Sequence, residues 1–376
     1  MKKYFTLAAL AIVCNTQAQT VTSSIQHDGL TREFIRHVPS IYDAEQPTPL
    51  VLVLHGLGDN MQNMSQVGFH QVSDTANFIV LTPQALMDDL TQATAWNSGA
   101  GTLGIGPNLD IDDVGFLSAL IDSTAADYNI DMDRIYVTGF SNGGFMTNRL
   151  ACELNDRISA FASVAGTIGG NITCNPGRAV PICHFHGTSD SNVGYDGSFF
   201  GGSVTDWLSF WKTNNQCGPE EDYRHLANSF NNGFTVETYF YSDNGAPDSR
   251  VLHYKVNGAD HIWLGPQNDV FYTFEIWRFF NNYPLRPNAT GISQVSAPEL
   301  SIYPNPTNGN SILTLDAKRA VESVTLTDLR GRSVLQLEGN STGRYDLFTS
   351  TLETGIYNIT VVMADGAVST SRLVRE

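Results

Sequence analysis

The segment RIYVTGFSNGGFMTNRL, residues 134–150, decides the fold. It opens as an apolar strand, passes through the pattern G-x-S-x-G centred on Ser141, and continues as a helix. That context is typical of a serine nucleophile held on a sharp turn between a strand and a helix. The glycines have a steric explanation, because side chains at Gly139 and Gly143 would collide with the neighbouring strand or helix. The alternative is a chance pattern in a glycine-rich loop, so the rest of the chain must supply the deciding residues.

Composition limits the classes of function that the chain can serve. Of its 376 residues, 41% are hydrophobic and 10% are aromatic, which suffices for a packed core. The formal net charge is −17, and a surface of that sign repels phosphate backbones and anionic lipids. The sequence therefore predicts no nucleic-acid partner and disfavours adhesion to a membrane surface.

The N-terminus has the pattern of a signal peptide, which we expect to cover residues 1–18. Lys2 and Lys3 precede the short apolar run YFTLAALAIVC, and TQA supplies a small residue at the expected cleavage point. A lipoprotein anchor at Cys14 is the alternative, but the bulky Val13 before it argues against that. The apolar run is too short to span a bilayer, and we expect an exported protein without a membrane span.

The pattern of apolar and polar residues in the remaining chain predicts two folded domains. Residues 19–286 alternate apolar strands with amphipathic helices, which predicts an α/β domain with helices on both faces of a parallel or mixed sheet. The helix expected at 113–128 places four apolar residues on one face, namely Phe116, Leu117, Leu120 and Ile121. Residues 287–297 have the composition of a linker. Residues 298–376 contain short alternating strands between turn residues, which predicts a small all-β sandwich.

Four cysteines follow the signal peptide, and in an exported chain they allow two disulfides. Cys152 and Cys174 are near in sequence and form the pair that we expect first. Cys183 lies in the apolar run VPICHFHG and can be a buried thiol, and the pairing of Cys217 stays open. No spacing of cysteine and histidine indicates zinc, and the sequence predicts neither a metal ion nor a cofactor.

Ser141 needs a base that accepts its proton and an acid that orients the base. In the fold that this turn indicates, the acid and then the histidine follow the serine along the chain. FHGTSD follows an apolar strand and ends at Asp190, and NGADHIW follows another strand and carries His261. We therefore predict Ser141 as nucleophile, Asp190 as acid and His261 as base, with Asp260 or Asp196 as alternatives for the acid.

An oxyanion hole needs two backbone donors, one after the nucleophile and one in the loop after an earlier strand. These criteria select the N–H groups of Asn142 and of Leu57, which lies in HGLG at a strand end. A plain glycine turn is the alternative for the second. His55 and His186 each precede a glycine at a strand end, and we expect them to hold loops through hydrogen bonds.

Two further groups of residues have competing interpretations. Trp96 and Trp263 are candidate substrate-binding residues because an indole ring can stack on a flat substrate, and a core or rim role is the alternative. A cluster of aspartates could bind calcium, but carboxylates at the start of a helix also cap it, and the second interpretation is favoured. The cluster consists of Asp110, Asp112 and Asp113.

Five motifs occur together in one order, namely LHGLGDN, DIDDVGFLSALI, YNIDMDRIYVTGFSNGGFMTNRLAC, FHGTSD and GADHIWLG. Over residues 20–285 the chain thereby resembles carbohydrate esterase family 1, which contains poly(3-hydroxybutyrate) depolymerases and feruloyl and acetylxylan esterases. The resemblance implies an α/β-hydrolase fold and a serine esterase. Matched by motif, it assigns Ser141, Asp190 and His261 to the triad. The loop Leu57-Gly58-Asp59 departs from members with a cysteine or more glycines there.

The C-terminal segment carries LSIYPNPTNG, VTLTDLRGR and LETGIYNITV and ends in RLVRE. It resembles the type A sorting domain of type IX secretion, which implies export through an outer membrane and the secretion machinery as a partner. A carbohydrate-binding sandwich is the competing interpretation, but the domain has few aromatic residues with which to stack on sugars.

Together these observations predict a secreted or surface-attached serine esterase that acts on polymer esters. Feruloyl or acetyl esters on plant cell-wall xylan are favoured, since no apolar polyester-binding module is evident. The alternatives are a poly(3-hydroxybutyrate)-type depolymerase and a catalytically silent surface-binding protein on a hydrolase fold.

Overall fold

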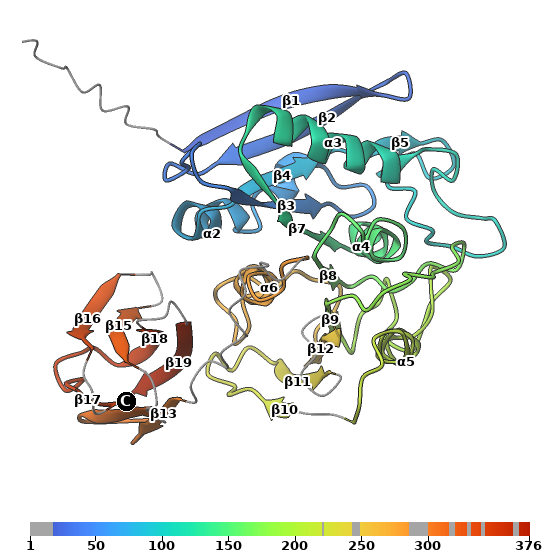
Figure 1. Ribbon diagram of the computed structural model, residues 1–376. Coiled ribbons are helices and arrows are strands. Elements are labelled where there is room, and N and C mark those ends of the chain that lie inside the picture. Colours follow the sequence, from blue (N-terminus) through green and yellow to red (C-terminus); the bar gives the residue numbers. More distant parts are fainter. Residues whose placement is uncertain are drawn as a thin grey trace, which may run out of the picture. The chain divides into compact units, whose positions relative to one another are not determined.

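The computed structural model describes residues 18–219, 222–242, 249–285, 300–315, 320–328, 332–339, 343–363 and 368–376. Contacts divide the chain into two units, Met1–Pro287 and Asn288–Glu376, and each is described by itself (Figure 1). The predicted signal peptide, apart from Ala18, and the predicted linker lie outside the described residues.

The first unit is built on a 10-stranded sheet with the order β1-β2-β4-β3-β7-β8-β9-β12-β11-β10. Parallel pairing runs from β4 to β12, and antiparallel pairs lie toward both edges. The strands are β1 Gln19–His27, β2 Leu30–Val38, β3 Thr48–Leu54, β4 Ile79–Pro83, β7 Ile130–Phe140, β8 Ala160–Val164, β9 Ile182–Gly187, β10 Asp222–His225, β11 Thr235–Tyr241 and β12 Val251–Asn257. A separate hairpin pairs β5 Leu86–Asp88 with β6 Ala93–Ala95.

Helices cover both faces of this sheet, as the sequence predicts. They are α1 Met61–Met64, α2 Phe69–Ala76, α3 Asp113–Asp127, α4 Asn142–Glu153, α5 Val204–Asn214 and α6 Tyr272–Phe280. Figure 1 shows α3, α4 and α5 on one face and α2 and α6 on the other. Within the described residues, no helix combines the length and the apolar character needed to cross a bilayer.

Side-chain alternation in the central strands explains the two layers of core. In β3, Leu50 and Leu52 face the core under α3, α4 and α5, whereas Val51 and Val53 face the core under α2 and α6. Alternate residues of a strand point to opposite faces, so a strand that is apolar throughout must be covered on both sides. The apolar stripe predicted for α3, with Phe116 among its members, is fully buried.

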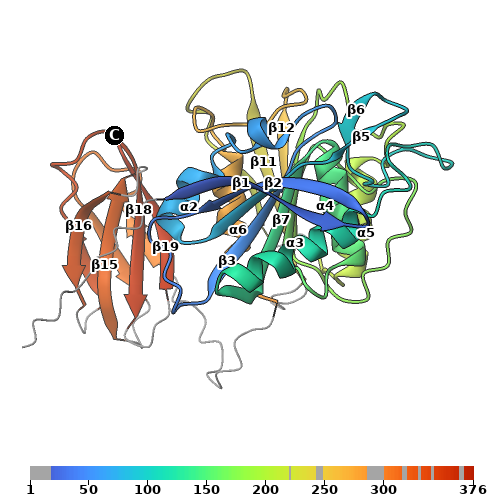
Figure 2. The same ribbon diagram turned by 90° about the horizontal axis from the view of Figure 1, so that it is seen from above.

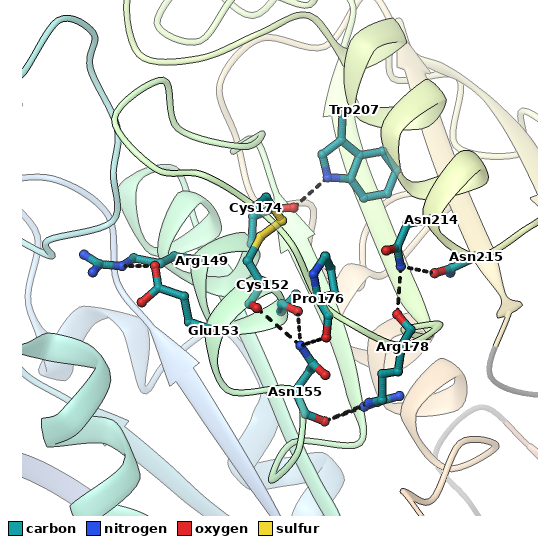
Figure 3. The surroundings of a disulfide bond; sticks show 12 residues. Arg149, Cys152, Glu153, Asn155, Cys174, Pro176, Arg178, Trp207, Asn214 and Asn215 are labelled. Atoms are coloured by element: carbon teal, nitrogen blue, oxygen red, sulfur yellow. Dashed lines mark hydrogen bonds and ion pairs between the residues drawn. A yellow bond between two sulfur atoms is a disulfide. The ribbon is translucent and has the colours of Figure 1, made fainter.

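A disulfide joins Cys152, in the last turn of α4, to Cys174 in the loop before β9 (Figure 3). This is the pair that the sequence predicts. The amide of Asn155 donates to the carbonyls of Ala151 and Pro176 at 3.0 Å each, and thereby fastens the same loop to the end of the helix. Helix α4, which begins directly after Ser141, is therefore fixed at its far end.

The second unit contains two antiparallel sheets, ordered β13-β14-β17 and β16-β15-β18-β19. Their strands are β13 Leu300–Tyr303, β14 Ser311–Leu315, β15 Val321–Asp328, β16 Ser333–Glu338, β17 Arg344–Leu347, β18 Gly355–Met363 and β19 Val368–Arg375. Leu313 and Leu347 from the first sheet and Leu326 and Ile359 from the second belong to one hydrophobic core. Two sheets around a shared core form the small β-sandwich that the sequence predicts.

Candidate active site

Ser141 lies on the turn between β7 and α4 with φ 55° and ψ −117°. A positive φ in a residue other than glycine is uncommon and is strained, and such residues gather at functional sites. The strain is held from both sides, because the Ser141 N–H donates to the Val164 carbonyl at 2.8 Å and the Ser141 carbonyl accepts from the Phe145 N–H at 2.9 Å. The structure thus places Ser141 at the kind of turn that the sequence indicates.

The two glycines of the motif are required by close backbone approaches. A Cβ built at Gly139 would lie 2.2 Å from the Gly143 carbonyl oxygen, and one at Gly143 would lie 2.4 Å from the Leu54 carbonyl oxygen. Carbon atoms do not approach oxygen so closely, so any side chain here would displace the turn. The steric reason predicted for both glycines is confirmed.

Backbone N–H groups without a protein partner gather near this turn. Asn142 is the first residue of α4, where helical N–H groups have no acceptor within the helix and carry the positive end of its dipole. Within the described residues, neither the Asn142 N–H nor the Leu57 N–H donates a hydrogen bond to the protein. The Leu57 loop is adjacent, since a Cβ at Gly56 would lie 3.2 Å from Cβ of Ser141.

The side chain of Asn142 fastens the turn to the loop after β6. Its Oδ1 accepts from the Trp96 N–H at 2.7 Å, and its Nδ2 donates to Oγ of Ser98 at 2.8 Å. Trp96 in turn donates from Nε1 to the His55 carbonyl at 2.9 Å. Trp96 is 0% exposed, so its ring cannot stack on a substrate. The substrate-binding prediction for Trp96 is wrong, and the core alternative holds.

His55 holds the Leu57 loop through hydrogen bonds that fix one tautomer of its imidazole ring. Its Nδ1 donates to the Gly56 carbonyl at 2.8 Å, and its Nε2 accepts from the Ala85 N–H at 3.0 Å. Burial lowers the pKa of His55 and outweighs the opposing effect of the Gly56 carbonyl. A neutral imidazole in this position fixes the loop without adding charge beside Ser141.

His261 and Asp190 form a hydrogen-bonded pair. Nδ1 of His261 donates to Oδ2 of Asp190 at 2.8 Å, and Asp190 is only 7% exposed. The His261 ring packs on Phe140, the residue before Ser141, with ring centroids 4.7 Å apart. Among the described residues, Oγ of Ser141 makes no hydrogen bond to His261, and such contacts are often long before substrate binds.

Asp260, the alternative acid, accepts hydrogen bonds from two loops and, among the described residues, none from the imidazole ring of His261. Its Oδ1 accepts from the N–H and the hydroxyl of Ser191 and from the N–H of His261, each at 2.8 Å. This carboxylate therefore ties the Asp190 loop to the His261 loop. Among the described residues, Asp196 forms neither a hydrogen bond nor an ion pair with His261.

His186 lies against the carboxylate of Asp190 and is hydrogen-bonded to the loop that carries it. Its Nε2 donates to the Val193 carbonyl at 2.8 Å and lies 3.4 Å from Oδ2 of Asp190, while Oδ1 of Asp190 accepts from the Val193 N–H at 2.7 Å. Burial alone would raise the pKa of Asp190, but the hydrogen bonds from His186, His261 and Val193 together hold that pKa below its ordinary value. The loop-holding role predicted for His186 is confirmed.

Two more histidines lie behind His186 in the core. Nε2 of His184 contacts Nδ1 of His186 at 3.0 Å, and His253 donates from Nδ1 to the His184 carbonyl at 3.2 Å while its Nε2 accepts from the Tyr195 hydroxyl at 2.8 Å. Burial lowers the pKa of His184 well below the ordinary value and that of His253 to about 3. This part of the site is therefore neutral.

Trp263 is half-buried beside the site. Its ring lies edge-on to Phe140 at a centroid separation of 6.4 Å, and its Nε1 donates to Oγ1 of Thr273 at 3.2 Å. Its role as a substrate-binding residue stays a prediction.

The aspartate cluster caps and anchors a helix. Asp112 is the N-cap of α3 and accepts from the Gly115 N–H at 2.9 Å. Asp113 is buried, with Oδ1 accepting from Arg32 at 2.6 Å and Oδ2 from the Asn97 N–H at 2.7 Å. These contacts support the capping interpretation favoured by the sequence. The hydrogen bond from the Asn97 N–H to Asp113 also holds the loop that carries Trp96, because Asn97 directly follows Trp96.

A buried acid–histidine pair beside a serine on a strained strand–helix turn defines the α/β-hydrolase class. Residues 38–198 match the phospholipase/carboxylesterase family, and residues 301–376 match the secretion system C-terminal sorting domain. The chain is 31% identical over 252 residues to probable feruloyl esterase C of Aspergillus niger, an alignment that covers 66% of this chain and 83% of that relative.

Two relatives are longer proteins. The chain is 27% identical over 248 residues to the bifunctional acetylxylan esterase/xylanase XynS20E of Neocallimastix patriciarum. That alignment covers 65% of this chain and 33% of the relative. It is 33% identical over 173 residues to feruloyl esterase B of Piromyces equi. That alignment covers 44% of this chain and 30% of the relative. The chain thus spans about a third of the length of each.

This chain belongs to the α/β-hydrolase carboxylesterase family that includes probable feruloyl esterase C. The resemblance and the fold class predicted from the sequence are confirmed. The C-terminal unit is a secretion sorting domain, which agrees with an extracellular or cell-surface location.

Proposed function

We propose that the protein is a secreted serine esterase that hydrolyses feruloyl or acetyl esters on plant cell-wall polysaccharide. The observation that carries the proposal is the 2.8 Å pair of His261 and the buried Asp190, packed on the residue before the strained Ser141. Family membership supports ester chemistry, and the names of the relatives support feruloyl and acetyl esters as substrates.

The residues have distinct roles in the proposed reaction. Ser141 attacks the ester carbonyl while Nε2 of His261 accepts its proton. Asp190 fixes the imidazole with its proton on Nδ1 and stabilises the imidazolium that forms. Because the pKa of Asp190 is held below its ordinary value, the carboxylate stays ionised at neutral pH.

Charge on the reacting oxygen is stabilised by the N–H groups of Leu57 and Asn142, since both are free of protein acceptors within the described residues. The protonated His261 then gives its proton to the departing alcohol oxygen, and an acyl group remains on Ser141. Water activated by the same histidine releases the acid and regenerates the serine.

Replacement of Ser141 by Ala tests the mechanism. The variant should lose nearly all turnover of p-nitrophenyl acetate and labelling by a fluorophosphonate probe, while its thermal unfolding stays cooperative. Retained turnover would refute the assignment, and failure of the natural protein to react with the probe would favour the catalytically silent alternative.

A substrate panel tests the ester class. We expect turnover of methyl ferulate or acetylated xylan to exceed that of poly(3-hydroxybutyrate), and the reverse order would favour the polyester depolymerase. For export, we propose that the N-terminal signal peptide and the sorting domain act in turn, with the type IX machinery as the partner of residues 301–376. Secretion from a host that has this machinery should stop when the sorting domain is deleted.

A further inference from the structure

The loop between β10 and β11, residues 226–234, lies at the edge of the sheet that carries His261. β12 runs parallel to β9, and β10 runs in the same direction as β12 because each is antiparallel to β11. The end of β10, the start of β11 and the end of β12 therefore share one edge, where the loops gather in Figure 2. The 226–234 loop is thus a neighbour of the loop that bears the proposed base.

Hydrogen bonds join these two loops directly. Oδ1 of Asp269 accepts from the N–H groups of Ser229 and Phe230 at 2.6 and 3.2 Å. Nδ2 of Asn232 donates to Oδ1 of Asn268 at 2.7 Å. These bonds link the 226–234 loop, including the backbone N–H of Phe230, to the segment that follows His261.

The underside of the loop is apolar and shares a core with the His261 loop. Leu226 and Phe234, at its two ends, pack against the hydrophobic cluster that also receives Ile262. Ile262 directly follows His261. The base of the loop is therefore anchored beside the catalytic edge, although its outer residues are exposed.

The outer surface combines an exposed aromatic ring with uncharged amides. Phe230 is 53% exposed, and its neighbours Asn228 and Asn231 are exposed as well. The segment 226–234 contains no charged residue. The Asn231 side chain makes no hydrogen bond to another described residue, so its amide can both donate to and accept from a ligand.

An exposed ring beside the unbonded amide of Asn231 matches the chemistry of a neutral sugar chain. The apolar face of a sugar ring packs on an aromatic side chain, and its hydroxyl groups pair with amides without any requirement for charge. A loop that is already fixed by Asp269 and Asn268 loses little conformational freedom on binding.

We propose that the 226–234 loop binds the main chain of a neutral polysaccharide and presents the ester substituents of that chain to Ser141. This inference rests on the proposed function and adds to it a contact outside the site of chemistry. Phe230 and Asn231 are the principal binding residues of the loop. The loop contributes to the binding of polymeric substrates and not to that of small esters.

Two readouts test the proposal. With acetylated xylan, Phe230→Ala should raise KM about five- to tenfold, with kcat for p-nitrophenyl acetate unchanged. Binding is measured separately with Ser141→Ala protein by affinity electrophoresis in gels that contain deacetylated xylan. There the Phe230→Ala change should abolish the retardation. Because this second readout involves no turnover, it stands even if the proposed esterase activity fails.

Phe348→Ala is the matched control, because Phe348 is a 62% exposed phenylalanine in the C-terminal unit. It should retain full retardation and an unchanged KM. The proposal is overturned if Phe348→Ala weakens binding and Phe230→Ala does not, since sugar binding would then belong to the β-sandwich. It is equally overturned if the protein binds poly(3-hydroxybutyrate) particles through Phe230 and shows no retardation by xylan.

Discussion

Nε1 of Trp96 donates a 2.9 Å hydrogen bond to the carbonyl oxygen of His55. The N–H of Trp96 donates to Oδ1 of Asn142 at 2.7 Å, so one buried residue is hydrogen-bonded to both segments that carry the proposed oxyanion donors. Leu57 lies two residues after His55, and Asn142 follows Ser141. We therefore expect the spacing between the two N–H groups to depend on a fully buried indole ring.

Trp96→Phe should lower kcat/KM for p-nitrophenyl acetate about tenfold. An aromatic side chain is kept, but the N–H donor to His55 is lost, at a cost of roughly 1–2 kcal/mol for a buried hydrogen bond. The loss should fall mainly on kcat, because the oxyanion forms only in the transition state.

Trp211→Phe provides the matched control for that change. Trp211 is equally buried, but its Nε1 has no partner among the described residues, so the same substitution removes no hydrogen bond. Its kcat should stay near that of the natural protein. Equal losses in the two variants would mean that packing, and not the bond to His55, sets the activity.

The sequence was sufficient to locate the candidate residues whose positions depend on local sequence patterns, while their catalytic roles stay a prediction. Ser141 is bracketed by glycines whose collisions can be foreseen from a strand–turn–helix pattern, and Asp190 and His261 each follow an apolar strand. Trp96 was misjudged because its burial depends on Asn142 and His55, which contact it from distant positions in the chain. No periodicity in the neighbourhood of Trp96 reports those contacts.

The pH dependence of stability should report the environment of Asp190. Its pKa in the folded protein is depressed below the ordinary value of 3.8, so its contribution to stability is complete above that pH and is lost as the pH falls through the folded-state pKa. Below about pH 4, the free energy of unfolding should therefore fall more steeply for the natural protein than for Asp190→Asn. Urea unfolding between pH 3 and 6 measures both slopes, and parallel curves would contradict the prediction.

The outer strands of the sheet have sequences that do not predict a strand, and the reason is physical. β1 reads QTVTSSIQH and β10 reads DYRH, and both are largely exposed edge strands with few apolar residues. An edge strand is stabilised by backbone pairing with its neighbour, and that pairing leaves little hydrophobic signal in its own sequence. The central strands, buried on both faces, carry continuous apolar runs and were predictable.

Gly143→Ala should abolish activity and destabilise the fold by several kcal/mol. The added Cβ would lie 2.4 Å from the Leu54 carbonyl oxygen, so β3 and α4 would have to separate at Ser141. Gly265→Ala is the control, since nothing lies within 4 Å of a Cβ there. Chemical denaturation gives both free energies, and a Gly143→Ala protein as stable as Gly265→Ala would show that the turn tolerates a side chain.

Loss of the Cys152–Cys174 disulfide should affect stability and leave chemistry intact. The bond closes a loop with a sequence separation of 22 at the end of α4 remote from Ser141. Cys152→Ala combined with Cys174→Ala should lower the free energy of unfolding by about 2–4 kcal/mol, because the unfolded chain regains the freedom of that loop. At 25 °C, kcat for p-nitrophenyl acetate should stay within about twofold, since the turn at Ser141 is held by its own hydrogen bonds to Val164 and Phe145. Dithiothreitol should lower the Tm of the natural protein and of a Cys217→Ser control, but not that of the double variant. A double variant that dithiothreitol still destabilises would indicate that a different pair of cysteines is bonded in solution.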